Sequence, residues 1–214
     1  MKLVWSPEKA CKAYLDTVKS CELFQESGVA ELVSAMAAGW DAKLIVETWS
    51  KGGLTATSVG LAVASRHAGG RHVCVVPDQE SREEYAEAMQ GAGMSPEVIV
   101  GEPEEAMEGL AGIDFLVVDC RRSEFSRVLR VAKLGHRGAV LVCKNASSSV
   151  AAGFRWRGVL DGKTRIVRSV LLPVGKGLDI AHVGAASCGG GRSGGRKWIR
   201  HFDKESGEEF LFRK

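Results

Sequence analysis

The chain has 214 residues, of which 45% are hydrophobic and 26% are charged, and its formal net charge is +3. This composition is typical of a globular domain with a full-sized core. No apolar run approaches the roughly 18 residues that span a bilayer, and residues 1–16 lack the uninterrupted apolar region of a secretory signal. The six cysteines form no C-x-x-C pair, which indicates a reducing compartment and no structural zinc. The sequence predicts a soluble cytoplasmic or nuclear protein without a membrane segment.

The charges are distributed unevenly along the chain. Residues 1–112 carry 9 Lys and Arg against 17 Asp and Glu, whereas residues 113–214 carry 20 against 9. A basic half can indicate an anionic partner such as a nucleic acid. The alternative, which we favour, is that acidic helices and basic loops segregate in the sequence and mix in space.

Taken in chain order, the first elements are two helices, a strand and a third helix. Ser6-Pro7 predicts a helix start with a serine cap and proline in the first turn. A second helix is predicted at Val29–Ala38. The β-branched run Leu44–Trp49 predicts a buried strand, which turns through Gly52-Gly53 into a helix at Leu54–His67.

Strands and helices then alternate. Further strands are predicted at His72–Pro77, Glu97–Gly101, Asp114–Asp119 and Gly138–Asn145. The intervening helices are predicted at Ser81–Gln90, opened by a Ser81–Glu84 capping box, and at Pro103–Leu110 and Ser123–Leu134. Such alternation is typical of βαβ units and a doubly wound parallel sheet.

The last strands differ from the others. Thr164–Pro173 and Leu178–Ala186 are joined by only four residues, VGKG, so they must form an antiparallel hairpin. We therefore predict an α/β fold: a Rossmann-like, doubly wound, mostly parallel seven-stranded sheet that ends in an antiparallel hairpin. Residues 1–186 would form this domain with its N-terminal helices. Residues 187–214 would form a Gly-rich linker and a small C-terminal hairpin that turns at Lys204–Gly207.

The ordered set of local motifs identifies a family resemblance. The motifs are LIVETWSKGG, VCVVPDQE, IVGEPEEAM, DFLVVDCRRSEF, GAVLVCKN and SVLLPVGKGLDIAHV. In this order the chain resembles class I S-adenosylmethionine-dependent methyltransferases of the catechol and caffeoyl-CoA O-methyltransferase type. It looks most like an uncharacterised plant family within that superfamily. The resemblance covers roughly Val29–Ala186 and implies S-adenosylmethionine as cofactor.

The resemblance also implies a set of cofactor-binding residues at the carboxyl ends of the strands. Glu47 would face the methionine portion, Glu102 the adenine amino group, and Asp119 would end the fourth strand, where metal-dependent members bind their ion. The remaining cofactor-binding candidates are the pocket wall Trp49, the glycine turn Gly52 and Gly53, and the hydroxylic residue Thr55.

Two positions depart from the family pattern. Val76 stands where a ribose-binding acid is expected, and Asp78 follows two residues later as its candidate replacement. Lys144-Asn145 replaces an Asp-Asn pair, and a lysine cation repels a divalent ion, so no metal is expected. We assign Asp119, Lys144 and Asn145 as catalytic candidates. Lys144 would form an ion pair with Asp119, an interpretation that we favour over a general base.

Simpler interpretations stay open for the same residues. Glu47 could pair with Lys51, Gly52-Gly53 could be only a tight turn, and Asp119 could cap the helix near Ser123. The resemblance implies methyl transfer to a small-molecule oxygen or nitrogen nucleophile. The alternatives are a catalytically degenerate binding or regulatory protein and, less favoured, a nucleic-acid binder that uses the basic segment Gly153–Arg165 around Trp156.

Overall fold

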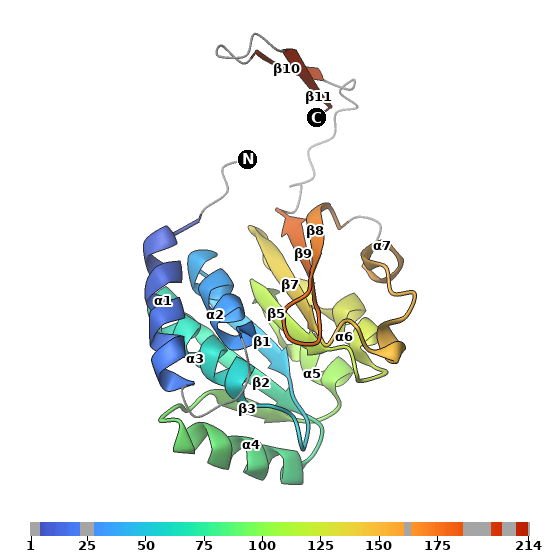
Figure 1. Cartoon of the computed structure of the whole chain (residues 1–214). Helices are drawn as coiled ribbons and strands as arrows, with labels where there is room; N and C mark the ends of the chain where they lie inside the picture. Colours follow the sequence, from blue (N-terminus) through green and yellow to red (C-terminus); the bar gives the residue numbers. More distant parts are fainter. Residues whose placement is uncertain (1–4, 22–27, 161–163, 186–197, 203–208, 214) are drawn as a thin grey trace.

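A seven-stranded sheet of order β3-β2-β1-β5-β7-β9-β8 forms the centre of the computed structural model (Figure 1). The structure describes residues 5–21, 28–160, 164–185, 198–202 and 209–213. The sheet strands are β1 (Leu44–Thr48), β2 (Arg71–Val76), β3 (Glu97–Val100), β5 (Phe115–Asp119), β7 (Gly138–Lys144), β8 (Ile166–Leu172) and β9 (Leu178–Gly184). The helices are α1 (Pro7–Ser20), α2 (Val29–Gly39), α3 (Ala56–Ala68), α4 (Gln79–Gly91), α5 (Pro103–Gly109), α6 (Phe125–Val131) and α7 (Trp156–Val159).

The strand directions confirm the predicted fold class. Each neighbouring pair from β3 to β7 is parallel, whereas β9 runs antiparallel to both β7 and β8. The order of connection reverses between β1 and β5, so the carboxyl ends of these strands border the point where ligands bind in open α/β sheets. The register sets Glu47 beside Cys74 and Asp119 beside Lys144.

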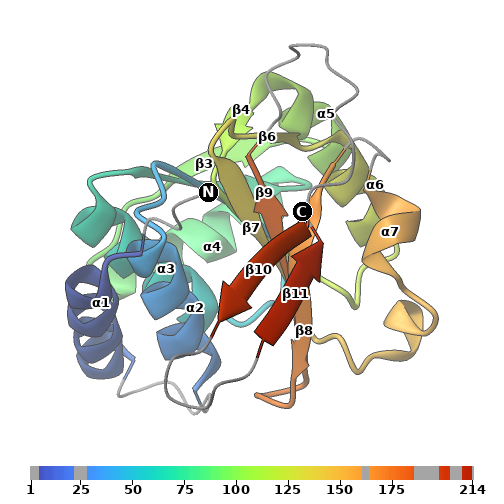
Figure 2. The same cartoon turned by 90° about the horizontal axis from the view of Figure 1, so that it is seen from above.

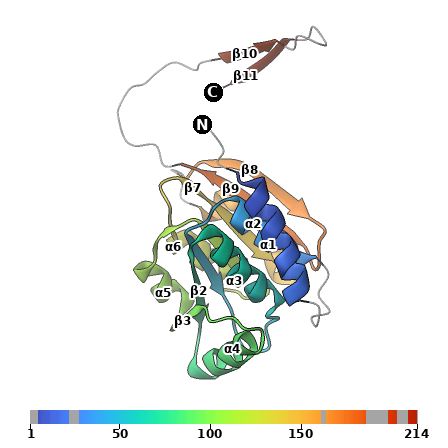
Figure 3. The same ribbon diagram turned by 90° about the vertical axis from the view of Figure 1, so that its left-hand side faces the viewer.

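Helices cover both faces of the sheet. Helices α1 to α4 lie over one face and α5 to α7 over the other, as the view from above and the side view show (Figures 2 and 3). One core cluster joins α1–α4 to the sheet, and a second joins α5–α7 to its opposite face. All seven residues of β7 are buried, because helices or strands cover it on every side. This burial explains the apolar run of residues 139–143.

Some element boundaries differ from the predicted ones. Helix α4 begins at Gln79 with Asp78 as its N-cap, so Ser81 lies inside the first turn and the predicted capping box is wrong. The segment predicted as one helix, Ser123–Leu134, contains α6 and then the short strand β6 (Lys133–Leu134), which pairs with β4 (Ala111–Ile113). The first difference is local, because the Asp78 carboxylate accepts the Ser81 amide and starts the helix earlier. The second arises because pairing with β4 overrides the helical propensity of Lys133–Leu134.

The C-terminal segment contains a further strand pair. β10 (Trp198–Phe202) pairs antiparallel with β11 (Glu209–Arg213). The predicted linker from 187 and the predicted turn at Lys204–Gly207 lie outside the described residues. The division into two domains therefore stays a prediction. Among the described helices, none is long and apolar enough to cross a membrane.

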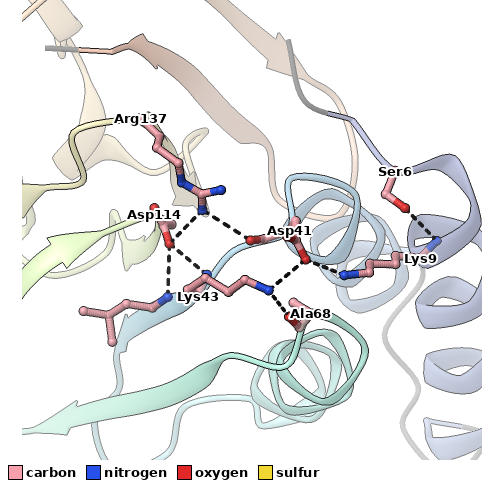
Figure 4. A network of polar contacts seen from close by, with 8 residues as sticks. Ser6, Lys9, Asp41, Lys43, Ala68, Asp114 and Arg137 are labelled. Atoms are coloured by element: carbon pink, nitrogen blue, oxygen red, sulfur yellow. Dashed lines mark hydrogen bonds and ion pairs between the residues drawn. The ribbon is translucent and has the colours of Figure 1, made fainter. Parts of the chain in front are cut away.

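A polar network fixes the start of β1, at the edge opposite the carboxyl ends (Figure 4). The buried Asp114 accepts hydrogen bonds from the backbone amides of Lys43 (2.8 Å) and Leu44 (3.3 Å). Arg137 lies 3.4 Å from the same carboxylate oxygen. Asp41, close by, pairs with both Lys9 and Lys43. The network therefore sets the position of β1 relative to β5.

Replacing Asp114 should test this anchoring. Asp114→Ala leaves two backbone amides without their acceptor, so we expect the free energy of unfolding to fall by about 1–3 kcal/mol. Urea denaturation followed by circular dichroism would measure the change. The exposed Glu105 supplies the control, Glu105→Ala, which should stay within about 0.5 kcal/mol of the wild type. Equal losses in both variants would contradict the anchoring role.

Candidate functional site

A small cavity lies at the carboxyl ends of β1, β2, β5 and β7. Its volume is about 20 Å³, which is room for about one water molecule. The lining residues come from the strand ends and the loops that follow them: Thr48, Trp49, Ser50, Gly53, Pro77, Pro103, Asp119, Arg122, Glu124, Phe125, Val128 and Lys144. Of the predicted site residues, the structure brings Trp49, Gly53, Asp119 and Lys144 together here.

Two of the lining side chains are only lightly held. Arg122 and Glu124 form an ion pair of 2.8 Å, and their side chains are 48% and 20% exposed. An exposed pair of this kind contributes about 0–1 kcal/mol. Moving these two side chains to widen the cavity therefore costs little free energy.

Glu47 does not line the cavity; it is fully buried in a polar cluster. Ser58 Oγ donates to its carboxylate at 3.0 Å, the Tyr85 hydroxyl donates at 2.8 Å, and His72 Nε2 lies 3.1 Å away. Burial alone would raise the pKa of Glu47, but the interactions with His72, Lys144 and Tyr85 outweigh it and lower the pKa. The alternative partner, Lys51, pairs instead with Glu80.

The glycine turn after β1 is attached to α4. The Gly52 amide donates to Glu84 at 3.0 Å, and the Lys51 amide donates to Ser81 Oγ at 3.2 Å. A Cβ at Gly53 would lie 2.7 Å from the indole nitrogen of Trp49, so packing of that ring against the turn is enough to require glycine.

Trp49 presents an unusual polar atom. Its side chain is 4% exposed and packs edge-on against Tyr85, with 5.3 Å between ring centroids. Its buried Nε1 has no hydrogen-bond partner among the described residues. An indole N–H normally finds an acceptor when buried, so this donor is available to a ligand.

Three further candidates sit at the starts of helices on the same edge. Asp78 caps α4, where one carboxylate oxygen accepts the Ser81 amide at 2.7 Å. Glu102 precedes α5 and is exposed, and Thr55 precedes α3; neither side chain makes a capping hydrogen bond. Val76, at the position expected for an acid, is fully buried in the core.

Asp119 makes its contact ion pair with Arg121, while the Lys144 charge acts on it from the neighbouring strand without a contact among the described residues. Arg121 Nη2 lies 2.6 Å from Oδ2, the Arg121 amide donates to Oδ1 at 2.9 Å, and Asn145 Nδ2 donates to Oδ1 at 2.9 Å. Burial would raise the pKa of Asp119, but these hydrogen bonds and the Lys144 charge lower it. Helix α6 has Glu124 as its N-cap residue, so Asp119 does not cap it.

Lys144 and Asn145 end β7 differently. Asn145 adopts a left-handed conformation with φ +58°, which asparagine tolerates better than most residues, and it turns its amide toward Asp119. Lys144 is 7% exposed. Among the described residues, its ammonium has no hydrogen-bond or ion-pair partner.

Trp156 is not available to stack on a nucleic acid. Its side chain is 6% exposed, its Nε1 donates to Asp179 at 2.7 Å, and its ring packs edge-on against Phe154. The less favoured alternative, in which Gly153–Arg165 binds a nucleic acid by stacking on Trp156, would need this ring to be exposed. Within the described parts of the chain, no three His, Cys, Asp or Glu side chains gather in a way that could hold a metal ion.

A family match spans the whole chain. Residues 1–214 match the family described as "Protein of unknown function (DUF1442)". The chain belongs to this family. No curated protein matches the sequence.

Solved structures of methyltransferases share the fold. A methyltransferase from Geobacter sulfurreducens matches with TM-score 0.58 and 21% identity over 83% of this chain and 90% of that one. The O-methyltransferase TomG of Streptomyces achromogenes, in complex with SAM, matches with TM-score 0.54 and 21% identity over 86% and 93%. An O-methyltransferase from Bacillus cereus in complex with SAH matches with TM-score 0.54 and 15% identity over 83% and 92%. These likenesses establish a Rossmann-like methyltransferase fold.

The buried cluster around Glu47 gives a stability prediction. Glu47→Ala removes the acceptor of three buried polar side chains, so we expect the free energy of unfolding to fall by about 3–5 kcal/mol. Glu97 pairs with Arg71 on the surface, and Glu97→Ala should cost at most about 1 kcal/mol. Urea denaturation measures both. A mild effect of Glu47→Ala would show that the cluster is dispensable.

The lowered pKa of Asp119 gives a pH prediction. A carboxyl whose pKa is lower in the folded state stabilises the protein above its unfolded pKa of about 4, and this stabilisation is lost as pH falls through the folded pKa. We expect Asp119→Asn to lose stability at pH 7 and to show a shallower decline than the wild type below about pH 4. Denaturant titrations at a series of pH values measure the slope, and parallel curves for the two proteins would refute the assignment.

Proposed function

We propose that this protein binds S-adenosylmethionine at the carboxyl edge of the sheet and transfers the methyl group to an oxygen or nitrogen nucleophile of a small molecule, without a metal ion. The observation that carries the proposal is a set of polar groups along the carboxyl edge of the sheet: Trp49 Nε1, which has no hydrogen-bond partner among the described residues, and the exposed carboxylates of Asp78 and Glu102. Structural neighbours crystallised with SAM or SAH support it.

The residues present fit the adenosine half of such a cofactor. Ribose hydroxyls and an adenine amino group are donors, and carboxylates are the acceptors best suited to them. Asp78 would hold the ribose and Glu102 the adenine amino group, while Trp49 would offer its N–H beside the glycine turn. The cavity of about 20 Å³ has to widen for the cofactor, and the lightly held Arg122–Glu124 pair supports this opening.

Glu47 and Asp119 act through other side chains in this proposal. Glu47 holds the Tyr85 hydroxyl, and Tyr85 packs against Trp49, so Glu47 fixes the wall of the pocket. Asp119 holds Arg121 and Asn145 at the ends of β5 and β7. Thr55, Gly52 and Gly53 shape the loop between β1 and α3.

Methyl transfer requires few reactive groups from the protein. The bound cofactor supplies an electrophilic methyl group, and transfer is an in-line displacement in which positioning provides most of the catalysis. Lys144 and Asn145 are placed to orient an acceptor. Independence from metal is supported by Asp119, whose carboxylate is already bonded to Arg121 and Asn145 and lies near the Lys144 charge. The Arg121 and Lys144 cations both repel a divalent ion.

The alternative function is a binding or regulatory protein with a methyltransferase fold. The small cavity and the buried Val76 favour this alternative. A protein of this kind would have lost cofactor binding, so binding of S-adenosylhomocysteine separates the two functions.

Calorimetry with S-adenosylhomocysteine tests the proposal. We expect the wild type to bind, and Asp78→Ser to bind about tenfold more weakly or worse, because a hydrogen bond to a charged group contributes about 1.5–3 kcal/mol. Serine keeps the helix cap, so the fold should be preserved. The exposed Glu87 on the same helix provides the control, Glu87→Ser, which should bind like the wild type. No heat with the wild type at millimolar ligand would overturn the methyltransferase proposal.

A further inference from the structure

A second, larger groove adjoins the candidate cofactor cavity. Its volume is about 330 Å³, which lies in the range of small-molecule sites. It is bordered by the start of α2, the loop between β1 and α3, the ends of β5 and β7, and the turn between β8 and β9. Lys144 lines both the groove and the small cavity, so the two spaces meet at this side chain.

The Lys144 side chain is buried without a counter-charge in contact. Val140 and Val142 of β7 belong to the core cluster under α1–α4, and alternation along the strand places Lys144 on that same face. Lys144 is 7% exposed and makes no hydrogen bond or contact ion pair among the described residues, although the carboxylates of Glu47 and Asp119 interact with its charge without contact. Burial of a charge is costly unless it is paired, and an anion in the groove would supply the contact that Lys144 lacks.

The other charged residues that line the groove have the same sign. Arg121 and Lys176 are also lining residues, and no described Asp or Glu lines the groove. Arg121 already holds Asp119, which offsets its charge. The positive potential of the groove therefore comes mainly from Lys144 and Lys176.

The turn that carries Lys176 is fixed against β7. The Ala146 amide donates to the Gly177 carbonyl at 3.0 Å, and the Ser147 amide donates to the Lys176 carbonyl at 3.1 Å. Gly177 has φ +87°, and a Cβ there would lie 2.6 Å from Ser147 Oγ. The backbone that presents Lys176 is thus preorganised beside the end of β7.

The N-terminal end of helix α3 borders the same groove. Thr57 in the first turn is a lining residue, and the N-cap residue Thr55 makes no side-chain capping bond. A helix N-terminus favours negative charge. Helix α3 has 13 residues, and its N-terminus and Lys144 border the same groove. Both would therefore act on one anionic group of a ligand.

The rest of the wall is apolar. Val29, Leu54, Val174 and Leu178 line the groove, and Leu54 is 51% exposed. A ligand that satisfies both parts has an apolar body and an oxyanion group.

We propose that this groove binds a small amphipathic oxyanion, a phosphate or carboxylate attached to an aromatic or aliphatic body, with the anionic group at Lys144 and Lys176. The inference rests on the proposed function only in making this anion the methyl acceptor, since Lys144 borders the cofactor cavity. Binding of the anion itself requires no cofactor.

Calorimetry without cofactor tests the site with phenyl phosphate, benzoate and the neutral analogue phenol. We expect both anions, or phenyl phosphate alone, to bind more tightly than phenol, with affinity falling as salt increases. Lys144→Met, close in shape and uncharged, should weaken anion binding about tenfold or more. Lys19 pairs with Asp16 on the surface of α1, and Lys19→Met should bind like the wild type.

Two controls keep the outcomes separate. Lys144→Met removes a charge that interacts with Glu47 and Asp119, so its urea unfolding is measured first and its anion binding is compared only where the variant is folded. Lys176→Ala on the exposed turn should weaken anion binding independently. Phenol binding as tightly as the anions, or unchanged anion binding in Lys144→Met, would overturn the inference. Anion binding without any binding of S-adenosylhomocysteine would uphold this site and reject the proposed function; the reverse result would reject this site alone.

Discussion

The carboxylate of Glu47 is the interaction on which the carboxyl edge of the sheet depends. It lies at zero exposure on β1 and joins three other elements through His72 on β2, Ser58 on α3 and Tyr85 on α4. A buried charge is tolerated only where hydrogen bonds replace its hydration. Tyr85 of this cluster packs against Trp49 and so fixes the position of its ring. The Trp49 ring in turn lies so close to Gly53 that this position of the turn requires glycine. An acid that sequence comparison assigns to a ligand is therefore a structural centre of the pocket.

The fold could be predicted from the sequence because local patterns encode it. The apolar runs of β1, β2, β5 and β7 are typical of strands buried on both faces, and a loop of four residues permits only an antiparallel connection between β8 and β9. The candidate site was less accessible. The partner of Asp119 is Arg121, two residues along the chain, but nothing in the sequence distinguishes it from Arg122, which pairs with Glu124. Which arginine pairs with Asp119 depends on side-chain geometry, and so does the small volume of the cavity.

The two spaces at this edge have contrasting electrostatics. The small cavity is bordered by two acids, Asp119 and Glu124, and by two cations, Arg122 and Lys144. The charged residues described around the groove are all cations. Lys144 separates them and belongs to both. A lysine in this position gives the protein an anion-attracting groove at the place where the resemblance would put a metal ion.

The position of β9 between β7 and β8 has a consequence for how the protein is made. Strand β7 obtains its second neighbour only from residues 178–184, which follow it by more than thirty positions. Because domains fold during synthesis from the N-terminus, β1, β2, β3, β5 and β7 leave the ribosome with the hydrogen-bonding edge of β7 still open. An open edge strand with an apolar run is a template for aggregation. The nascent chain is thus exposed to mispairing until β9 is synthesised, and the same event completes the groove beside Lys144.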